Sequence, residues 1–322
     1  MAGKRKEDIH MNMKPLEDFV KRAAEEDLKI EGLYVLLDGA PVFEHRWTPD
    51  QPRNIYSHTK SFVSTAVGIA VDEDRISLSD RLIDCFPEKI PEGGNPGLEK
   101  ITLEHLLTMS SGFGKPYLMN GDRRGGKGFP DYTAYMMAQP VIEEPGEKFC
   151  YSTADSILIG RMLESKLGCN LSEFMYDKVL KPMDIPFPIW ECCPQGHPVG
   201  GGGMHLALKE MAKLGQLYLG GGVWNGRRIV SEAWIKAASS KHMDTPMPEA
   251  MKKSGHTPDP WHCGYGYQFW MCPFGGAYRA DGAFGQITIV YPEKQMVISY
   301  QCPENGEYAR VQKAVDEMIR EL

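Results

Sequence analysis

Ser57-His58-Thr59-Lys60 stands between a polar turn, Pro52-Arg53-Asn54, and the apolar run Phe62-Val63-Ser64-Thr65-Ala66-Val67-Gly68-Ile69-Ala70-Val71. The stretch predicts a buried helix that is opened by a serine and a lysine. Side chains three residues apart lie on one helical face, so the lysine amine is placed to take the proton of the serine hydroxyl. A helix N-terminus also favours negative charge on that oxygen. Ser57 is therefore a candidate nucleophile and Lys60 its candidate base.

Length and charge narrow the possible functions of the chain. It has 322 residues and a net charge of -7, and its pI is near 5.8. One large domain, or a core with an insertion, is the natural expectation for this length. An acidic balance argues against nucleic acid as a partner, because such proteins need a basic face. No stretch approaches the roughly 18 apolar residues of a membrane-spanning helix, so we expect a soluble, cytoplasmic protein without a membrane partner.

Cysteine and histidine spacing gives no sign of a metal or cofactor. The eight cysteines include no C-x-x-C pair, so free thiols in a reducing compartment are the expected state. No H-x-x-x-H or His/Cys cluster of the zinc type is present. We therefore expect neither a metal site nor a cofactor.

Hydrophobic periodicity predicts strands near both ends of the chain and helices between them. Asp38-Gly39 is a hairpin signal between two early strands. The expected elements are helices at 16–28 and 308–322 and strands at 32–37, 41–47, 265–270, 277–280, 286–291 and 296–300. This order predicts an α+β fold (an α/β sandwich), in which terminal helices cover an antiparallel sheet and an all-α lobe is inserted. The expected parts are 1–75 plus 220–322 as the sheet core and 76–219 as the lobe, with the active site between them.

Four further segments extend the Ser57-x-x-Lys60 motif into an ordered series. They are Ile101–Gly112 (ITLEHLLTMSSG), Pro145–Thr153 (PGEKFCYST), Gly200–Leu206 (GGGGMHL) and Ala280–Gln286 (ADGAFGQ). In this order, from about Gly32 to Tyr300, the chain resembles the serine β-lactamase and penicillin-binding-protein superfamily. It resembles most its class C-like branch, which includes esterases, D-amino-acid peptidases and nylon-oligomer hydrolases. The resemblance implies a β-lactamase/transpeptidase-like fold.

The resemblance also implies roles for particular residues. Ser57 would attack a carbonyl, Lys60 would act as base, and Tyr151 would relay the proton to the leaving group. The backbone N–H groups of Ser57 and Ala283 would form the oxyanion hole.

Five residues are expected to bind or border the substrate: Thr153, Asp281, Gly282, Tyr117 and Trp190. Two of these positions depart from the family pattern. Thr153 replaces an asparagine, and Ala280-Asp281 replaces the Lys-Thr pair of β-lactamases and transpeptidases. A carboxylate at the pocket would repel β-lactam and peptide carboxylates, which favours small uncharged esters and amides.

Three functions remain open from the sequence. The leading one is a serine hydrolase that cleaves a small-molecule ester, amide or peptide through an acyl-Ser57 intermediate. The alternatives are a β-lactamase or D,D-peptidase with penicillin-binding activity, and a non-catalytic binder or sensor of the same fold. Structural roles compete at individual positions, since Tyr151 also suits an apolar core, Thr153 a helix cap and Asp281 a turn. The sequence does not predict an oligomeric state.

Overall fold

The fold is built on one antiparallel sheet whose strands differ in length. The computed structural model describes residues 12–246, 260–304 and 307–322, so residues 1–11, 247–259 and 305–306 of the expected sheet core lie outside the description. The strand order in the six-stranded sheet is β2-β1-β10-β9-β8-β7. Its strands are β1 (Gly32–Leu37), β2 (Ala40–Arg46), β7 (Trp270–Met271), β8 (Tyr278–Gly282), β9 (Gln286–Tyr291) and β10 (Met296–Gln301). Strands from both ends of the chain thus pair, which confirms the expected fold class.

The first hairpin follows the turn signal in the sequence. Asp38 and Gly39 join β1 to β2, with Leu37 paired to Ala40. Both turn residues have positive φ, 50° and 75°, the backbone that a two-residue turn of this hand requires.

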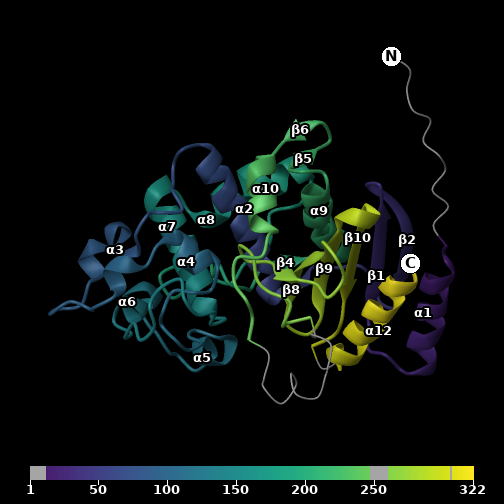
Figure 1. The fold of residues 1–322 in the computed structure, drawn as a ribbon, viewed down its shortest axis with the longest axis horizontal. Helices are drawn as coiled ribbons and strands as arrows, with labels where there is room; N and C mark the ends of the chain where they lie inside the picture. The colour runs from purple at the N-terminus through teal and green to yellow at the C-terminus, as the bar shows by residue number, and fades with distance from the viewer. Residues whose placement is uncertain (1–11, 247–259, 305–306) are drawn as a thin grey trace.

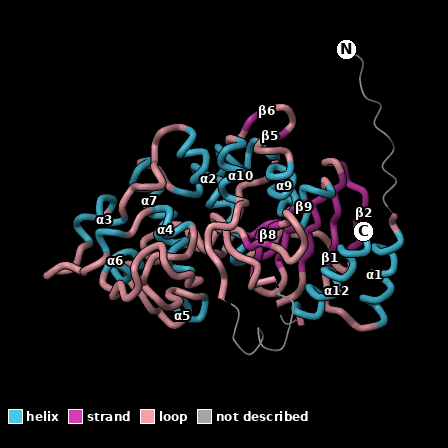
Figure 2. The backbone as a smooth tube through the Cα atoms, viewed as in Figure 1, coloured by secondary structure: helices cyan, strands magenta, loops and turns pink. Residues whose placement is uncertain are grey.

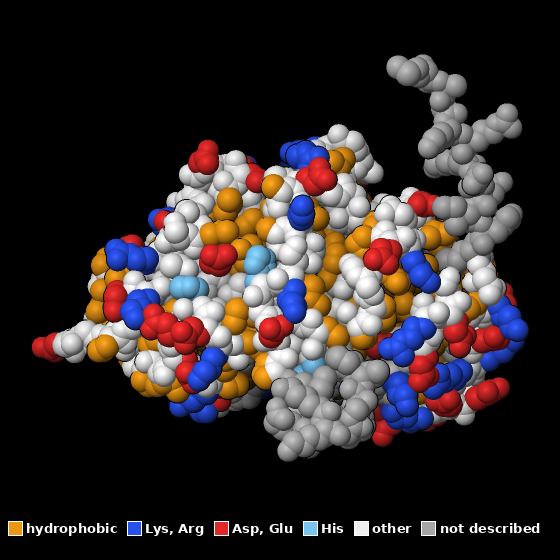
Figure 3. Space-filling model, in the orientation of Figure 1, with side chains coloured by type: hydrophobic (Ala, Val, Ile, Leu, Met, Phe, Trp, Pro, Cys, Tyr) orange, Lys and Arg blue, Asp and Glu red, His pale blue; other side chains and the backbone are white. Residues whose placement is uncertain are grey.

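The two terminal helices, α1 (Lys14–Glu25) and α12 (Tyr308–Glu321), lie side by side on one face of the sheet (Figure 1). Arg22 in α1 donates to Glu317 in α12 at 2.6 Å. Beneath the helices lies an apolar layer to which β1, β9 and β10 contribute alternate residues, among them Leu33, Val35, Ile287, Ile289 and Ile298. On the outside, charged side chains of both signs gather over these helices (Figure 3). The expected covering of the sheet by terminal helices is confirmed.

The opposite face of the sheet carries α9 (Leu208–Leu219). Ala212 packs against Leu36 and Val297, and Gly215 comes so close that an added Cβ would lie 2.6 Å from Val297. Small residues on α9 therefore allow the helix to lie directly on the sheet. The boundaries expected for the inserted lobe, 76–219, stay a prediction, but they assign to the lobe a helix that packs on the sheet.

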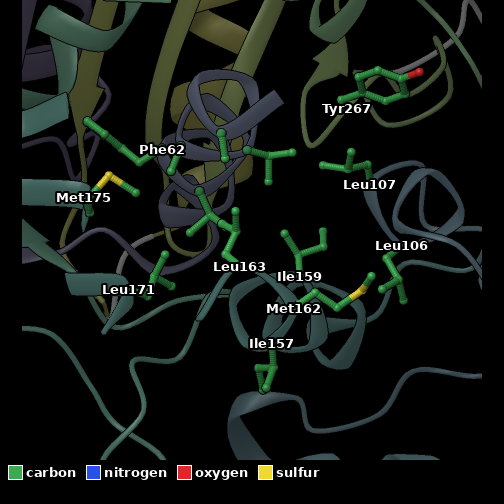
Figure 4. Close-up of a cluster of buried hydrophobic side chains, with 14 of the residues drawn as sticks. Phe62, Leu106, Leu107, Ile157, Ile159, Met162, Leu163, Leu171, Met175 and Tyr267 are labelled. Carbon is green, nitrogen blue, oxygen red and sulfur yellow. The ribbon is translucent and has the colours of Figure 1, made fainter. Parts of the chain in front are cut away.

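Helices and loops fill the half of the molecule beyond α9 (Figure 2). A buried apolar cluster joins α2, α4, α7 and α8 there; its members include Phe62, Leu107, Met162, Leu163 and Met175 (Figure 4). The helices are α2 (Thr59–Asp72), α3 (Leu82–Cys85), α4 (Leu103–Leu107), α5 (Asn120–Arg124), α6 (Tyr132–Met137), α7 (Thr153–Leu167), α8 (Leu171–Met175) and α10 (Glu232–Ala238). Two short strand pairs complete the structure: β3 (Arg53–Asn54) with β4 (His205–Leu206), and β5 (Val223–Trp224) with β6 (Arg227–Arg228). No helix in the described ranges is long and apolar enough to cross a membrane.

The expected strand at 265–270 is wrong, because the chain turns back on itself there. Gly266 N donates to Phe269 O at 2.8 Å, and Gln268 has a φ of 65°, which an extended strand excludes. Only Trp270–Met271 joins the sheet, as β7. The turn directs the Gln268 side chain into the helical half of the molecule instead.

Gln268 links three helices through buried hydrogen bonds. Its Oε1 accepts from Ser156 in α7 at 2.6 Å, and its Nε2 donates to Leu107 O in α4 at 2.8 Å. Its own carbonyl accepts from Ser61 in α2 at 2.8 Å. Buried polar groups that lose their partners are costly, so this one residue, through its side chain and its carbonyl, holds the helices to the segment that leads into the sheet.

We expect Gln268→Ala to lower the free energy of unfolding by about 1–3 kcal/mol, since the Ser156 hydroxyl and a backbone carbonyl lose their partner. Chemical denaturation measures the loss. Gln295→Ala is the matched control, because Gln295 also has a positive φ, 49°, but is exposed; it should cost less than about 0.5 kcal/mol. Equal losses in the two variants would contradict the linking role of Gln268.

Candidate active site

Ser57 lies in a single tight turn, Tyr56–His58, that leads directly into α2. The turn is fixed by hydrogen bonds from two backbone N–H groups: Ile55 N donates to the backbone Met204 O at 2.9 Å, and Tyr56 N donates to the side-chain Asn54 Oδ1 at 2.8 Å. Tyr56 has a φ of 49°, an unusual backbone for a bulky residue. The serine therefore stands at the start of the helix in a constrained position, as the sequence predicts.

Lys60 is brought to Ser57 by the first turn of α2. Its side chain is buried, at 1% exposure. Nζ donates to Gly201 O at 2.6 Å and to Ser57 Oγ at 3.2 Å. At the second distance, a neutral amine is equally placed to accept the hydroxyl proton.

Burial adjusts the proton affinity of this lysine. Loss of water around Nζ, with a further contribution from the positive charge of Arg123, lowers the pKa of Lys60 to about 7. Asp155 acts in the opposite direction. A substantial fraction of Lys60 is therefore a neutral amine near neutral pH, the state that a general base needs.

Tyr151 completes the cluster from the residues just before α7. Lys60 Nζ lies over the Tyr151 ring, 5.3 Å from the ring centroid. Burial raises the pKa of Tyr151, while a hydrogen bond with Ser57 lowers it in part. The phenol thus stays protonated at neutral pH. The structure brings Ser57, Lys60 and Tyr151 together, although their catalytic roles stay a prediction.

The turn that carries Ser57 is anchored to the sheet by His58. This side chain is fully buried, and its Nε2 pairs with Thr288 Oγ1 in β9 at 3.0 Å. Thr288 in turn pairs with Ser299 in β10 at 2.8 Å. Burial lowers the pKa of His58 to about 3, so the imidazole is neutral and holds position without carrying charge.

Strand β8 ends against the same turn. A Cβ added to Gly282 would lie 2.1 Å from Ile55 O and 3.1 Å from His58 N. Only glycine allows this approach, which brings the end of β8, just before Ala283, against the turn that carries Ser57. The oxyanion hole formed by the N–H groups of Ser57 and Ala283 stays a prediction that this approach supports.

Asp281 is already engaged by a neighbour on its own strand. Arg279 Nε donates to its Oδ2 at 2.8 Å, and the two side chains are 1% and 11% exposed. The Arg279 guanidinium lies over the rings of Trp261 and Trp270, with Cζ at 5.7 and 5.8 Å from their centroids. The expected repulsion of carboxylates by Asp281 is therefore offset by a buried positive charge that the sequence alone did not indicate.

Trp190 supports the glycine turn beside Lys60. Its Nε1 donates to Val199 O and Gly202 O, both at 3.0 Å. The next residue, Glu191, accepts two hydrogen bonds from Arg123 at 2.9 Å. The indole N–H therefore fixes the backbone whose Gly201 carbonyl holds Lys60. The expectation that Trp190 borders the substrate stays a prediction.

Tyr117 and Thr153 are both buried. Tyr117 is buried among aromatic rings and its N–H donates to Ser152 Oγ at 3.1 Å. The Thr153 hydroxyl donates to Met119 Sδ at 3.3 Å, and its methyl group lies where a side chain on Gly201 would be. Substrate binding by either residue stays a prediction.

Asp155 is a residue of the site that the sequence reasoning missed. It is completely buried in the first turn of α7, and its Oδ1 accepts from Ser111 Oγ at 3.0 Å. Burial raises the pKa of Asp155 to about 8, although Ser111 and Lys60 counteract the rise. Its signal in the sequence is a single acidic residue at the head of the apolar run Ala154–Gly160.

No group of three or more His, Cys, Asp and Glu side chains in the described residues could hold a metal ion.

Comparison with known proteins identifies the family of this chain. The Beta-lactamase family model matches residues 20–317. The chain belongs to the beta-lactamase family. This family membership accounts for the combined sheet and helical halves and confirms the resemblance drawn from the sequence motifs.

Relatives within the beta-lactamase family differ in what their names say they do. The chain is 22% identical to the 6-aminohexanoate-dimer hydrolase of Paenarthrobacter ureafaciens over 307 residues, which cover 88% of this chain and 76% of that protein. Its fold is similar to that of an octameric penicillin-binding protein homologue from Pyrococcus abyssi (TM-score 0.71, 22% identity, 96% and 78% coverage). It is equally similar to a family VIII carboxylesterase (TM-score 0.71, 17% identity, 96% and 97% coverage).

We expect Asp281→Ala to lower the free energy of unfolding by about 3–5 kcal/mol, because it leaves the buried Arg279 guanidinium without its carboxylate. Urea denaturation measures this. The control is Asp84→Ala, which breaks a similar pair with Arg81 at 2.8 Å whose side chains are half exposed, 51% and 49%; it should cost less than about 1 kcal/mol. If Asp281→Ala lowers the free energy of unfolding no more than Asp84→Ala does, the Arg279–Asp281 pair is accessible to water and the prediction is wrong.

Proposed function

We propose that the protein is a serine hydrolase that cleaves a small ester or amide through an acyl-Ser57 intermediate. The observation that carries the proposal is the position of the buried Lys60 amine, which is hydrogen-bonded to Ser57 Oγ at 3.2 Å and has a pKa lowered to about 7. A neutral base next to a hydroxyl at a helix start is the arrangement that activates a serine. The names of a carboxylesterase and a dimer hydrolase among its relatives support the same reaction class.

The steps of the reaction follow from the groups in contact. Ser57 Oγ forms a bond to the substrate carbonyl carbon while its proton passes to Lys60 Nζ. The bond to the leaving group then breaks, and the Tyr151 hydroxyl passes a proton to that group and is reprotonated by the Lys60 ammonium. Water cleaves the acyl-serine by the reverse proton transfers. The backbone N–H groups of Ser57 and Ala283 receive the carbonyl oxygen.

Charge pairing around the serine favours an uncharged substrate. Among the described residues of the site, Arg123 is paired with Glu191 and Arg279 with Asp281. The position of the family's strand lysine is taken by Ala280. Neither guanidinium has its charge available for a substrate carboxylate, so small neutral esters and amides fit better than β-lactams or peptides with a C-terminal carboxylate.

A second candidate function, that of a β-lactamase or D,D-peptidase, is favoured by one observation. Arg279 offsets the charge of Asp281, so the site does not repel an anionic substrate as strongly as its sequence indicates. Intact-mass measurement after exposure to penicillin distinguishes this function: a stable adduct on Ser57 or rapid turnover of the drug would place it above ester hydrolysis.

We expect the purified protein to hydrolyse p-nitrophenyl butyrate and both Ser57→Ala and Lys60→Ala to lower kcat by at least about a thousandfold, because each removes a group that acts in the chemical step. Lys100→Ala is the control: this exposed lysine is paired with Glu144, and its variant should retain full activity. Unchanged hydrolysis in Ser57→Ala would assign the activity to another group. Absence of hydrolysis in the wild type, with both this ester and the matched anilide, would contradict the proposed class and favour a binder or sensor.

We expect kcat/KM to rise with pH through about 7, since Lys60 has its pKa lowered to about 7 and has a lone pair only when it has lost its proton. Below that pH, Lys60 gains a proton and the rate should fall about tenfold per pH unit. A buffered pH series between 5 and 9 with the same ester measures the profile. A rate independent of pH below about 6 would exclude Lys60 as the base.

A further inference from the structure

Two aromatic side chains meet next to the two backbone N–H groups that the proposed reaction uses as an oxyanion hole. Tyr56 directly precedes Ser57, and Phe284 directly follows Ala283. The centroids of the two rings are 5.1 Å apart and the rings are inclined by 65°, the edge-to-face arrangement that aromatic pairs prefer. The segments that carry the two N–H groups are thus joined by a direct side-chain contact, which the hydrolytic steps above do not use.

Ala283 lies between two residues that both contact the turn carrying the serine. On one side, Gly282 approaches so closely that an added Cβ would lie 2.1 Å from Ile55 O. On the other side, the Phe284 ring contacts the Tyr56 ring. The backbone of the residue between them is therefore held against the serine turn from both sides.

The backbone at both rings has an unusual conformation. The angle φ is 49° at Tyr56 and 61° at Phe284, in the left-handed region that bulky side chains seldom adopt. Such conformations cost free energy, persist where the surroundings hold them, and occur often at functional sites. Here they flank the two donor residues. Ser57 is half-buried and Ala283 is exposed, so a substrate can reach both.

Neighbouring groups hold each ring-bearing residue in place. Tyr56 is buried; its N–H donates to Asn54 Oδ1 at 2.8 Å, and its hydroxyl is hydrogen-bonded to the side chain of Glu304. Phe284 O accepts from Nε2 of the buried Gln286 at 3.4 Å. The two rings therefore meet from supported positions and not as loose surface side chains.

We propose that the Tyr56–Phe284 contact is a positioning contact that fixes the separation of the Ser57 and Ala283 N–H groups before a substrate binds. An oxyanion hole lowers the barrier when both donors reach the place that the charged oxygen will occupy, and donors already in place need no reorganisation during the reaction. The catalytic meaning of this inference rests on the proposed hydrolase function. Its geometric meaning, that the rings hold two backbone segments together, does not.

Phe284→Leu tests the contact, because leucine keeps an apolar side chain but removes the ring. We expect kcat for p-nitrophenyl butyrate to fall by about ten- to a hundredfold, less than for the loss of a whole donor. KM should change by less than about twofold, because the contact acts on the transition state. Phe284→Tyr restores the ring and should restore most of the rate. A rate in Phe284→Leu equal to that of the wild type would overturn the inference.

Phe274→Leu is the matched control for the loss of a ring. Phe274 is also half-buried and also contacts a tyrosine ring, that of Tyr291, with centroids 5.7 Å apart. It packs against the core beneath the terminal helices, on the side of the sheet away from Ser57. Its variant should keep the wild-type kcat.

Tyr56→Phe separates the effect of the ring from that of the hydroxyl. It removes the hydrogen bond to Glu304 but keeps the contact with Phe284, so kcat should stay close to that of the wild type. A loss as large as that in Phe284→Leu would overturn the inference, because the hydrogen bond and not the ring contact would then set the rate. If Phe284→Leu does not fold, Tyr56→Leu removes the other ring of the pair and takes its place in every measurement.

Crystal structures of the wild type and Phe284→Leu give a readout that does not depend on hydrolysis. We expect the separation of Ser57 N and Ala283 N to change by more than about 0.5 Å, the tolerance of a preorganised site. An unchanged separation would overturn the inference whatever the rate. A changed separation, in a protein whose wild type hydrolyses neither the ester nor the matched anilide, would overturn the proposed function and leave the structural role of the rings standing.

Discussion

The structure depends on keeping one lysine amine out of water beside a serine hydroxyl. Removing an ammonium from water is expensive, and the cost is reduced when the group gives up its proton and keeps its N–H bonds satisfied. The Gly201 carbonyl supplies the acceptor for Lys60, and the Ser57 hydroxyl supplies the second partner. The other residues of the site hold Gly201 O and Ser57 Oγ in place.

Two supports hold them, and they come from different halves of the molecule. On the sheet side, His58 and Thr288 connect the serine turn to β9. On the helical side, Trp190 holds the glycine turn that carries the lysine's acceptor. Neither support brings a net charge, because His58 is neutral and the indole N–H is a dipole. The local field at Lys60 is therefore determined mainly by Arg123 and Asp155.

Sequence reasoning predicted the parts of the fold and site that depend on local spacing. Ser57 and Lys60 are three residues apart on one helix, and the Asp38-Gly39 turn fixes its own backbone, so both could be predicted from neighbouring residues. The partners of Trp190, Arg279 and Asp155 could not, because they are set by segments brought together only by folding. The alternation in residues 265–270 suggested a strand, but the positive φ of Gln268 and the gain from its three buried contacts prevailed over local propensity. The family resemblance predicted that Ala283 and Asp281 lie in the site. It did not predict that Arg279 pairs with Asp281 and offsets its charge.

The sheet separates two apolar cores, one beneath the terminal helices and one shared with α2 and α9. Along β9, Ile287 and Ile289 face the outer core, whereas Thr288 between them faces the serine turn. Substitutions in the outer core can thus change how firmly the chain holds together while the environment of Ser57 stays the same. An evolving lineage can gain or lose robustness in that outer layer and explore new substrates in the inner one, with little interference between the two.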